Sequence, residues 1–383
     1  MAKQTPAILM PILDTHFAQL DLLRYPEQHN SSLQAFDAAD EYLLKHLSSY
    51  PLASHARTLV LNDSFGALAA SLCAQMQVHS SGDSFLAHQA LQENLERNQL
   101  TTDKIQIIRS DQAFNGPYNC VLIRVPKTLA LLEEQLIRLQ SQINADTIII
   151  AAGMIKHLPR SAGDLLERYI GPVQASLAEK KARLLFVTPS NKPHASSPYP
   201  SIYQLDTPAL HLRNHAGIFC REALDIGTRF FLPHLPTDLG NAEVADLGCG
   251  NGILGIVCAL NNPQAQLRMV DESYMAVQSA KENWQLALGE RPVTIYPGDG
   301  LGAEQPDSLD LVLCNPPFHQ QQVVGDFLAR RMFQQSHRAL KKDGELWIVG
   351  NRHLGYHVTL KRFFGEVKQI AANAKFVILK ATK

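Results

Sequence analysis

The chain has 383 residues, and its 35 Lys and Arg against 36 Asp and Glu give a formal net charge of −1. This balance excludes a global basic field for nucleic acid, and six scattered cysteines without a Cys-x-x-Cys pair exclude a disulfide framework. No apolar run approaches the roughly 20 residues that span a bilayer. We therefore expect a cytoplasmic monomer of two domains, without a secretion signal, a membrane segment or a metal.

The first half alternates predicted strands and helices. Strands are expected at residues 58–62, 105–108 and 120–125, one helix at 67–76, and a second helix that follows Gly82-Asp83-Ser84 and runs through Leu95. Residues 188–200, which read TPSNKPHASSPYP, are rich in Pro and Ser and predict a domain boundary. We place a linker at 191–205, between a first domain at 1–190 and a second at 206–383.

The second half repeats this alternation. Helices are expected at residues 253–260, 274–288 and 327–340, and strands at 244–247, 267–270, 293–296, 309–314, 345–349 and 376–379. Strands that alternate with helices in this way predict an α/β fold with a doubly wound, parallel sheet.

Short motifs recur in the two halves at nearly constant spacing. Glu93-Asn94 precedes Glu282-Asn283 by 189 residues, and Arg124-Val125-Pro126 precedes Asn315-Pro316-Pro317 by 191. We infer a tandem duplication of one fold, with chance similarity of two α/β domains as the alternative. The first copy has lost most of the glycines and the Asn-Pro-Pro segment, so we expect it to bind no cofactor and to serve recognition or stability.

The glycine turn of the second copy begins at Asp246, where the sequence reads DLGCGNGILG. Glycines permit a tight turn and a close approach of a ligand, and the following helix offers free N–H groups. Asp271 closes the next strand, where its carboxylate can accept hydrogen bonds from ribose hydroxyls. Gly250-x-Gly252-x-x-Gly255 also satisfies the nicotinamide dinucleotide fingerprint, so the turn alone leaves the cofactor open.

Three features favour S-adenosylmethionine. Asp246 places a carboxylate near the cationic methionine end of that cofactor, and Asp299 follows the third strand, where it can accept from the adenine amino group. The fourth strand ends in Asn-Pro-Pro-Phe, which nicotinamide enzymes do not need. The predicted cofactor-binding residues are Asp246, Gly248, Cys249, Gly250, Asn251, Gly252, Asp271, Glu272 and Asp299.

The segment 219–231 comes just before the glycine strand. We expect it to cover the cofactor through Phe219, Asp225 and Gly227, and an ordinary packing helix is the alternative.

The tetrapeptide Asn315-Pro316-Pro317-Phe318 supplies the predicted catalytic residues. A planar amino nitrogen is a poor nucleophile, because its lone pair is delocalised. Two acceptors, the Asn315 side-chain oxygen and the stiffly held Pro316 carbonyl, can orient its N–H bonds and direct the lone pair at a methyl group. Phe318 offers a face on which a flipped base can stack. Adenine N6, guanine N2 and a glutamine side-chain amide all fit this chemistry.

Other polar residues are weaker candidates. His211 and His215 stand four residues apart but have no apparent third ligand, so we expect no metal site. Lys180, Lys181 and Arg183 are predicted to contact phosphate, with a solvated surface as the alternative. Arg352 follows the fifth strand, on the edge where such sheets bind ligands, and is predicted with His319 and Phe318 to bind the substrate.

These motifs together resemble a known family. The glycine motif, the Val-Asp-Glu-Ser at 270–273 and Cys314-Asn-Pro-Pro-Phe-His-Gln-Gln resemble the bacterial ribosomal RNA guanine-N2 methyltransferases. Nearly the whole chain is similar to the large-subunit branch, most clearly in the segments at 38–44, 61–68, 125–133 and 351–354.

The resemblance implies two tandem Rossmann-like class I methyltransferase domains with seven-stranded, mostly parallel sheets, the first degenerate and the second catalytic. It also implies methylation of guanine N2 in 23S rRNA, at the nucleotide that the family name gives as guanine 1835. Methylation of a protein glutamine, methylation of a 16S rRNA guanine and a non-enzymatic RNA-binding module are the alternatives.

Overall fold

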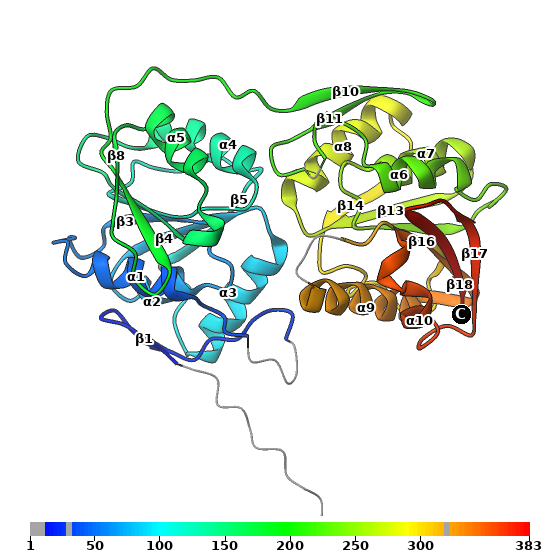
Figure 1. Ribbon diagram of the computed structural model, residues 1–383, viewed down its shortest axis with the longest axis horizontal. Coiled ribbons are helices and arrows are strands. Elements are labelled where there is room, and N and C mark those ends of the chain that lie inside the picture. The colour runs from blue at the N-terminus through cyan, green and yellow to red at the C-terminus, as the bar shows by residue number, and fades with distance from the viewer. Residues whose placement is uncertain (1–11, 28–32, 219, 318–321) are drawn as a thin grey trace, which may run out of the picture. The chain divides into compact units, whose positions relative to one another are not determined.

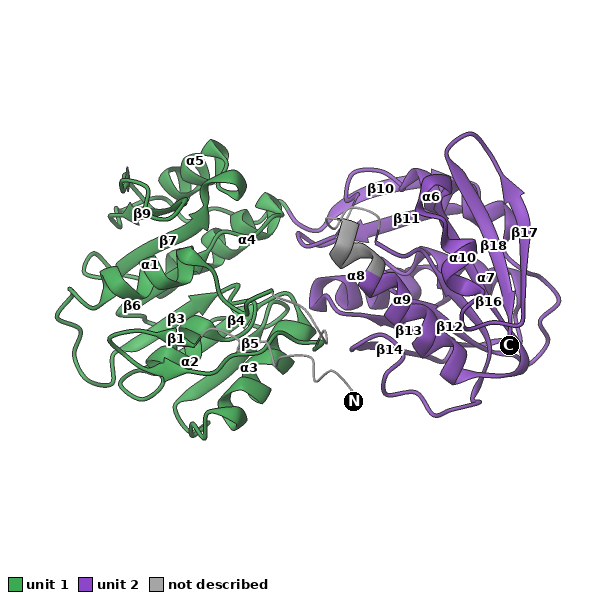
Figure 2. Cartoon of the chain, turned by 60° about the horizontal axis from the view of Figure 1, so that its bottom comes forward, with its two compact units in different colours: residues 1–198 green, residues 199–383 purple. Residues whose placement is uncertain are grey.

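The computed structural model describes residues 12–27, 33–218, 220–317 and 322–383 (Figure 1). The chain divides into two compact units, residues 1–198 (unit 1) and 199–383 (unit 2), shown in Figure 2. Among the described residues, no helix is both long and apolar enough to cross a membrane.

Unit 1 contains a seven-stranded sheet in the order β5-β4-β3-β6-β7-β9-β8. The first five strands of this order are parallel, and β9 pairs antiparallel with β7 and β8. The strands are β3 (Arg57–Leu61), β4 (Gln77–Gly82), β5 (Ile105–Arg109), β6 (Cys120–Arg124), β7 (Ile148–Met154), β8 (Val173–Ala175) and β9 (Ala182–Val187).

Five α-helices are described in unit 1, together with a small pair of strands, β1 (Leu13–Asp14) and β2 (Gln19–Leu20). The helices are α1 (Ala38–Leu47), α2 (Ala67–Leu72), α3 (Phe85–Arg97), α4 (Leu129–Leu139) and α5 (Arg160–Tyr169). Helices α1 to α3 bury one apolar cluster against the sheet, and α4 and α5 bury another. The sheet therefore has apolar side chains on both faces, as a doubly wound fold requires.

Unit 2 repeats this topology with the strand order β14-β13-β12-β15-β16-β18-β17. Five strands are again parallel, and β18 is antiparallel to both neighbours. The strands are β12 (Glu243–Leu247), β13 (Gln266–Asp271), β14 (Val293–Pro297), β15 (Leu309–Cys314), β16 (Leu340–Asn351), β17 (Glu366–Ala372) and β18 (Phe376–Thr382). The predicted α/β class and the mostly parallel seven-stranded sheets are confirmed.

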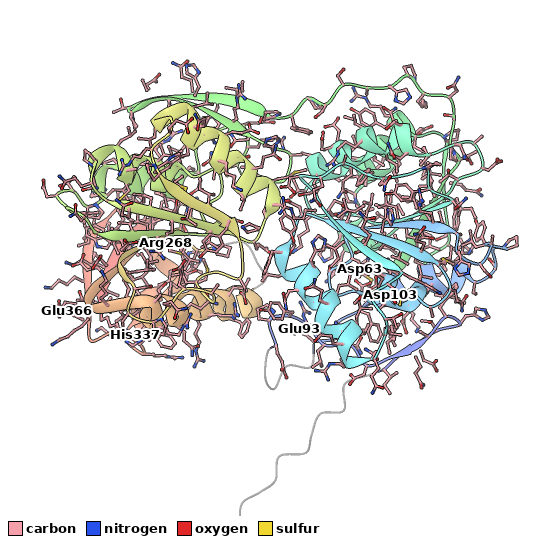
Figure 3. The ribbon with its side chains drawn as sticks, turned by 180° about the vertical axis from the view of Figure 1, so that it is seen from behind. Asp63, Glu93, Asp103, Arg268, His337 and Glu366 are labelled. Carbon is pink, nitrogen blue, oxygen red and sulfur yellow. The ribbon has the colours of Figure 1, made fainter. Side chains whose placement is uncertain are left out.

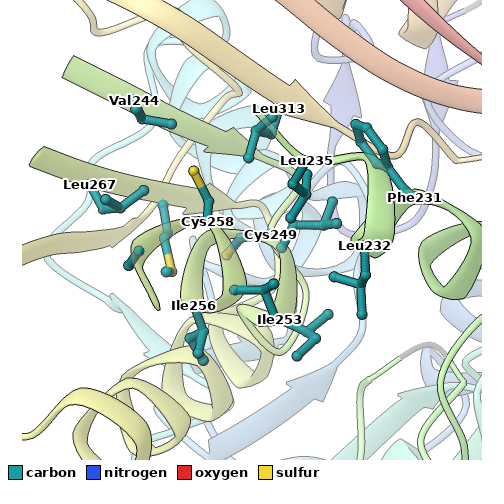
Figure 4. Close-up of a cluster of buried hydrophobic side chains, with 14 of the residues drawn as sticks. Phe231, Leu232, Leu235, Val244, Cys249, Ile253, Ile256, Cys258, Leu267 and Leu313 are labelled. Carbon is teal, nitrogen blue, oxygen red and sulfur yellow. The ribbon is translucent and has the colours of Figure 1, made fainter. Parts of the chain in front are cut away.

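Helices cover both faces of the second sheet. The first face carries α6 (Ile226–Phe231), α7 (Ile253–Asn261) and α8 (Tyr274–Leu288), and the other carries α9 (Gln322–Ala339) and α10 (Tyr356–Leu360) (Figure 1). Successive strand residues alternate between the two cores: Val244 and Leu313 belong to the first, shown in Figure 4, and Ala245 and Val312 to the second.

Several predicted boundaries differ from those in the structure. The helix expected at 67–76 ends at Leu72, because the chain turns there to enter β4, and the N–H groups of Gln75 and Met76 donate to the Leu72 carbonyl. The linker expected at 191–205 has no helix or strand from 191 to 200, but Ser201–Asp206 forms strand β10. Its hydrogen-bonding partner is β11 (Ala209–Asn214), so the hairpin depends on a pairing that the Pro- and Ser-rich composition did not indicate.

Candidate active site

The candidate residues of unit 2 follow the carboxyl ends of neighbouring parallel strands. Leu247 of β12 lies opposite Val270 of β13 on one side and Cys314 of β15 on the other. The glycine turn, Asp271 and Asn315 therefore begin at the same edge of the sheet, which is the edge where doubly wound sheets bind ligands.

The glycine turn is held by backbone hydrogen bonds and has left-handed residues. The N–H groups of Gly248 and Cys249 both donate to the Val270 carbonyl, at 2.9 and 3.0 Å. Gly250 has φ of +55°, and a Cβ there would meet no atom of the described residues within 4 Å. Gly252 has φ of +85°, and a Cβ there would lie 3.1 Å from Ala280. The first position thus leaves space for a ligand, and the second lets α7 pack on α8.

Asp246 is fully buried beneath this turn. Its Oδ2 accepts a hydrogen bond from the Gly255 N–H at 2.8 Å, and its Oδ1 has no partner among the residues the structure describes. Burial raises the pKa of this carboxyl to about 7, although the Gly255 bond opposes the shift. An unpaired buried carboxylate oxygen is a favourable place for a cationic ligand group.

Asp271 ties the end of β13 to the glycine turn. Its Oδ2 accepts from the Gly250 N–H at 2.8 Å, and its Oδ1 accepts from the Ser273 N–H at 2.9 Å. Burial raises the pKa of this carboxyl above its usual value. The Glu272 N–H also bonds to this carboxyl. Because the two carboxylate oxygens have about four acceptor positions between them, about one is left for a ribose hydroxyl. Glu272 is exposed beside it.

The side chains of Cys249 and Asn251 turn away from the ligand edge. Cys249 packs in the apolar core shown in Figure 4. The amide nitrogen of Asn251 donates to Asn214 Oδ1 at 2.9 Å and to the Tyr203 hydroxyl at 3.2 Å, both on the β10–β11 hairpin. Only backbone atoms of these two residues therefore remain for a cofactor.

Asp299 forms a two-fold hydrogen-bonded ion pair with Arg331 of α9. The Gln335 side chain also donates to the Asp299 carbonyl at 3.1 Å. Arg331 was not among the predicted site residues, since nothing in the sequence links two positions 32 residues apart. The adenine contact predicted for Asp299 has to share the carboxylate with this guanidinium.

Asn315 follows β15 and is held by two groups of helix α6. Its Nδ2 donates to Asp225 Oδ2 at 3.1 Å and to Thr228 Oγ1 at 2.9 Å. Its Oδ1 is buried and makes no hydrogen bond within the described part of the chain. Asp225 caps α6, because the same Oδ2 accepts from the Thr228 N–H at 2.9 Å. An acceptor oxygen is thereby left over beside the buried Pro316.

Other predicted residues have different placements. Gly227 lies in α6, where a Cβ would be 3.0 Å from Asp225 Oδ2 and 3.2 Å from Phe376. Pro317 is exposed. Phe219, Phe318 and His319 lie outside the described residues.

Beyond β16, Arg352 is exposed, and its guanidinium donates to the Asn373 carbonyl at 3.2 Å. The preceding Asn351 has a buried Oδ1 that has no partner in the described structure.

The three predicted phosphate contacts belong to unit 1. Lys180 pairs with Glu41 at 3.2 Å, Lys181 is exposed, and Arg183 has a buried Nε without a partner among the described residues. The ion pair with Glu41 partly offsets the positive charge of Lys180. The phosphate contact stays a prediction.

Unit 1 has its own side chains at the corresponding positions. Arg124 is the last residue of β6 and corresponds to Asn315, which follows β15; it pairs with Asp37 at 2.9 Å and with Asp40. Asp63, labelled in Figure 3, accepts hydrogen bonds from the N–H groups of Leu68 and Ala69 at the start of α2. Burial, with the charge of Asp40, raises the Asp63 pKa to about 6. That unit 1 binds no cofactor stays a prediction.

The doubly wound sheet, the glycine turn and the Asn-Pro-Pro edge of unit 2 define a methyltransferase of the S-adenosylmethionine-dependent class. The residues fit that cofactor, because among the described residues nothing occupies the space at Gly250 and nothing pairs with the Asp246 Oδ1, which can accept from a cation. Residues 10–191 match the family described as RLMG N-terminal domain, and residues 209–380 match the Methyltransferase small domain.

The relatives are similar over their full length. A protein of Stutzerimonas stutzeri (strain A1501), named Ribosomal RNA large subunit methyltransferase G, is 67% identical over 98% of this chain and 100% of its own. A protein of the same name from Pseudomonas putida (strain W619) is 65% identical with the same coverage. The chain therefore belongs to the family of ribosomal RNA large subunit methyltransferase G, as the sequence resemblance predicted.

A solved structure has the same fold throughout. The T. thermophilus 16S rRNA N2 G1207 methyltransferase (RsmC), in complex with AdoMet and guanosine, has a TM-score of 0.78 at 19% identity and covers 97% of both chains. The tandem arrangement of two methyltransferase folds is thus confirmed.

Proposed function

We propose that this protein transfers a methyl group from S-adenosylmethionine to the exocyclic N2 of a guanine in 23S rRNA. It does so as a cytoplasmic monomer, and the nucleotide is the one its family name gives as guanine 1835. The single observation that carries the chemistry is the buried Oδ1 of Asn315, which has no partner among the described residues, at the ligand edge of the sheet.

The residues around Asn315 orient an amino group. Asn315 Oδ1 accepts one N–H of the guanine amine, and the Pro316 carbonyl accepts the other. Two fixed acceptors pull the nitrogen away from the base plane and direct its lone pair, so that positioning accounts for most of the rate. Phe318 stacks on the base, and His319 and Arg352 contact its surroundings.

The cofactor, when bound, supplies a methyl group that is already activated for transfer. Asp246 accepts from its cationic methionine end, and the backbone of Gly248 to Gly252 surrounds that end. Asp271 and Glu272 accept from the ribose, and Asp299 accepts from the adenine amine. These roles are supported by acceptor oxygens that point to one sheet edge.

The choice of RNA rests on the relatives, which are named as large-subunit ribosomal RNA enzymes and one of which is 67% identical to this chain. The choice of guanine N2 rests on the resemblance of the motifs to the guanine-N2 family. Unit 1 serves RNA recognition or stability, with Lys180, Lys181 and Arg183 on phosphates.

The test is a transfer assay with methyl-labelled S-adenosylmethionine, unmodified 23S rRNA, unmodified 16S rRNA and ribosomal protein offered separately. Label is expected only in 23S rRNA, and nuclease digestion with mass spectrometry should find N2-methylguanine. Label in 16S rRNA or on a glutamine would replace the proposed substrate. Absence of label from every acceptor would contradict the proposed methyltransferase activity.

A further inference from the structure

We propose that Asp225 and Thr228 are positioning residues of the methyl transfer, which fix the side-chain amide of Asn315 so that its Oδ1 faces the acceptor amine. This inference rests on the proposed function. It assigns Asp225 a different task from the cofactor contact expected from the sequence, and it adds Thr228, which the sequence did not indicate.

The direction of the Asn315 amide follows from the chemistry of Asp225. An ionised carboxylate only accepts hydrogen bonds, so the group 3.1 Å from Asp225 Oδ2 has to be the Asn315 NH₂. A rotated amide would bring two oxygens together and lose the bond. Thr228 Oγ1 receives the second Nδ2 hydrogen bond at 2.9 Å and lies 3.4 Å from the same Asp225 oxygen, to which it donates.

Both donor hydrogens of the Asn315 amide are thus used inside the protein. Its oxygen is the part left over, buried and without a partner in the described structure. A buried acceptor without a partner is unfavourable in the free protein and gains a hydrogen bond when a donor arrives. The N–H of a planar amine is such a donor.

Unit 1 contains the same arrangement with different residues. Asp37 caps α1 as Asp225 caps α6, and Asp40 and Thr228 each stand three residues after the cap. Helix α1 packs on β7 and β9, and α6 packs on the corresponding β16 and β18. Arg124, the last residue of β6, donates to both Asp37 oxygens, at 3.0 and 2.9 Å, and to Asp40.

The duplicated fold therefore joins the residue at the carboxyl end of its fourth strand to the start of its first core helix in each copy. In unit 1 the contact is an ion pair, and a guanidinium has no acceptor to present. In unit 2 the contact is made by the neutral amide of Asn315. Its NH₂ group is bonded to Asp225 and Thr228, and its oxygen is left as an acceptor. This difference points to a positioning role in unit 2.

The first test compares Asp225→Asn, Thr228→Val and Thr228→Ser with the wild type in the transfer assay and in titration calorimetry with S-adenosylmethionine. Asparagine still caps a helix, so Asp225→Asn should fold. We expect kcat to fall at least about tenfold in Asp225→Asn and Thr228→Val, with the cofactor Kd unchanged within about twofold. Thr228→Ser keeps the hydroxyl and should retain the wild-type kcat.

Asp37→Asn is the matched control, since it makes the same chemical change at the corresponding cap of unit 1. It should lower the melting temperature and leave kcat unchanged. A cofactor Kd that rises in Asp225→Asn as much as kcat falls would overturn the inference and return Asp225 to cofactor binding.

A double-mutant comparison isolates the route of the effect. In an Asn315→Ala background, Asp225→Asn should cause no further loss of kcat, because the amide that it positions is gone. Full additivity would show that Asp225 acts independently of Asn315 and would overturn the inference.

A measurement without turnover separates this inference from the proposed function. The Asn315 side-chain NH₂ signal in ¹⁵N-labelled protein, assigned by its loss in Asn315→Ala, should shift in Asp225→Asn and Thr228→Val but not in Asp37→Asn. An unchanged signal would contradict positioning even if the wild type methylates 23S rRNA. A shifted signal in a protein that labels no acceptor would contradict the proposed function alone.

Discussion

Arg124 of unit 1 and Asn315 of unit 2 occupy the same position in two copies of one sheet. The preceding residues show this: Ile123 lies opposite Leu61 of β3, and Cys314 lies opposite Leu247 of β12. One copy has a cation there and the other a neutral amide. The predictions below follow from this difference and from the acceptor oxygens at the ligand edge.

Arg124→Met should destabilise the protein by about 3–5 kcal/mol at pH 7, because Asp40 would be left buried without its partner. Urea unfolding of variant and wild type measures the change. The deficit should shrink at lower pH, where Asp40 can take up a proton. Lys45→Met, at an exposed pair with Glu179, is the control and should cost about 1 kcal/mol or less. Equal costs would show that the Arg124 cluster is not a structural ion pair.

Titration calorimetry with S-adenosylmethionine should give one molecule bound per chain. In unit 1 the side chains of Arg124 and Asp63 are engaged where unit 2 has Asn315 and the glycine turn. A stoichiometry of two would contradict the assignment of all chemistry to unit 2.

Asn315→Ala should reduce kcat by about 100-fold or more, since it removes one of the two acceptors that orient the amine. The cofactor Kd should stay within about twofold, because the Asn315 amide is bonded to α6. Steady-state assays on 23S rRNA and calorimetry measure the two quantities. Asn191→Ala, on an exposed segment, is the control for the substitution itself. Activity at the wild-type rate would refute the orientation mechanism.

Cofactor affinity should depend on pH through Asp246, whose pKa is raised to about 7 by burial. A cationic ligand favours the ionised carboxylate, so affinity is full above pH 7. It should fall by up to about tenfold per unit as the pH drops below 7 and the carboxyl is protonated. Calorimetry between pH 5.5 and 8 measures this slope.

Asp246→Asn is the control and should flatten the profile below pH 7. The free energy of unfolding of the cofactor-free protein should instead decrease as the pH rises. The raised pKa stabilises the folded state at low pH, and this contribution is lost as the pH rises through about 7. A wild-type affinity that does not vary with pH would show that Asp246 does not face the cation.

Local patterns in the sequence predicted most elements of unit 2 but fewer of unit 1, where strands β4, β7, β8 and β9 and helices α1, α4 and α5 were not predicted. The helix at 274–288 and the strand at 309–314 have the predicted bounds, because apolar runs and helical spacing depend on nearby residues. Strand β17 was not predicted, and helix α6 was expected only as the alternative for residues 219–231. β17 has a mostly exposed pattern with a weak apolar signal, and α6 is only six residues long.

The sequence by itself determined the class of chemistry, because the glycine turn and the Asn-Pro-Pro segment carry their function within a few consecutive residues. It also determined the duplication, through spacings that both halves share. Only the tertiary structure decided how the Asn315 amide is oriented, since Asp225 lies 90 residues earlier and contacts it only in the folded domain. The same holds for Arg331 on Asp299 and for Arg124 between Asp37 and Asp40. Such hydrogen bonds join distant positions, and they exist only once the strands and helices between them have packed.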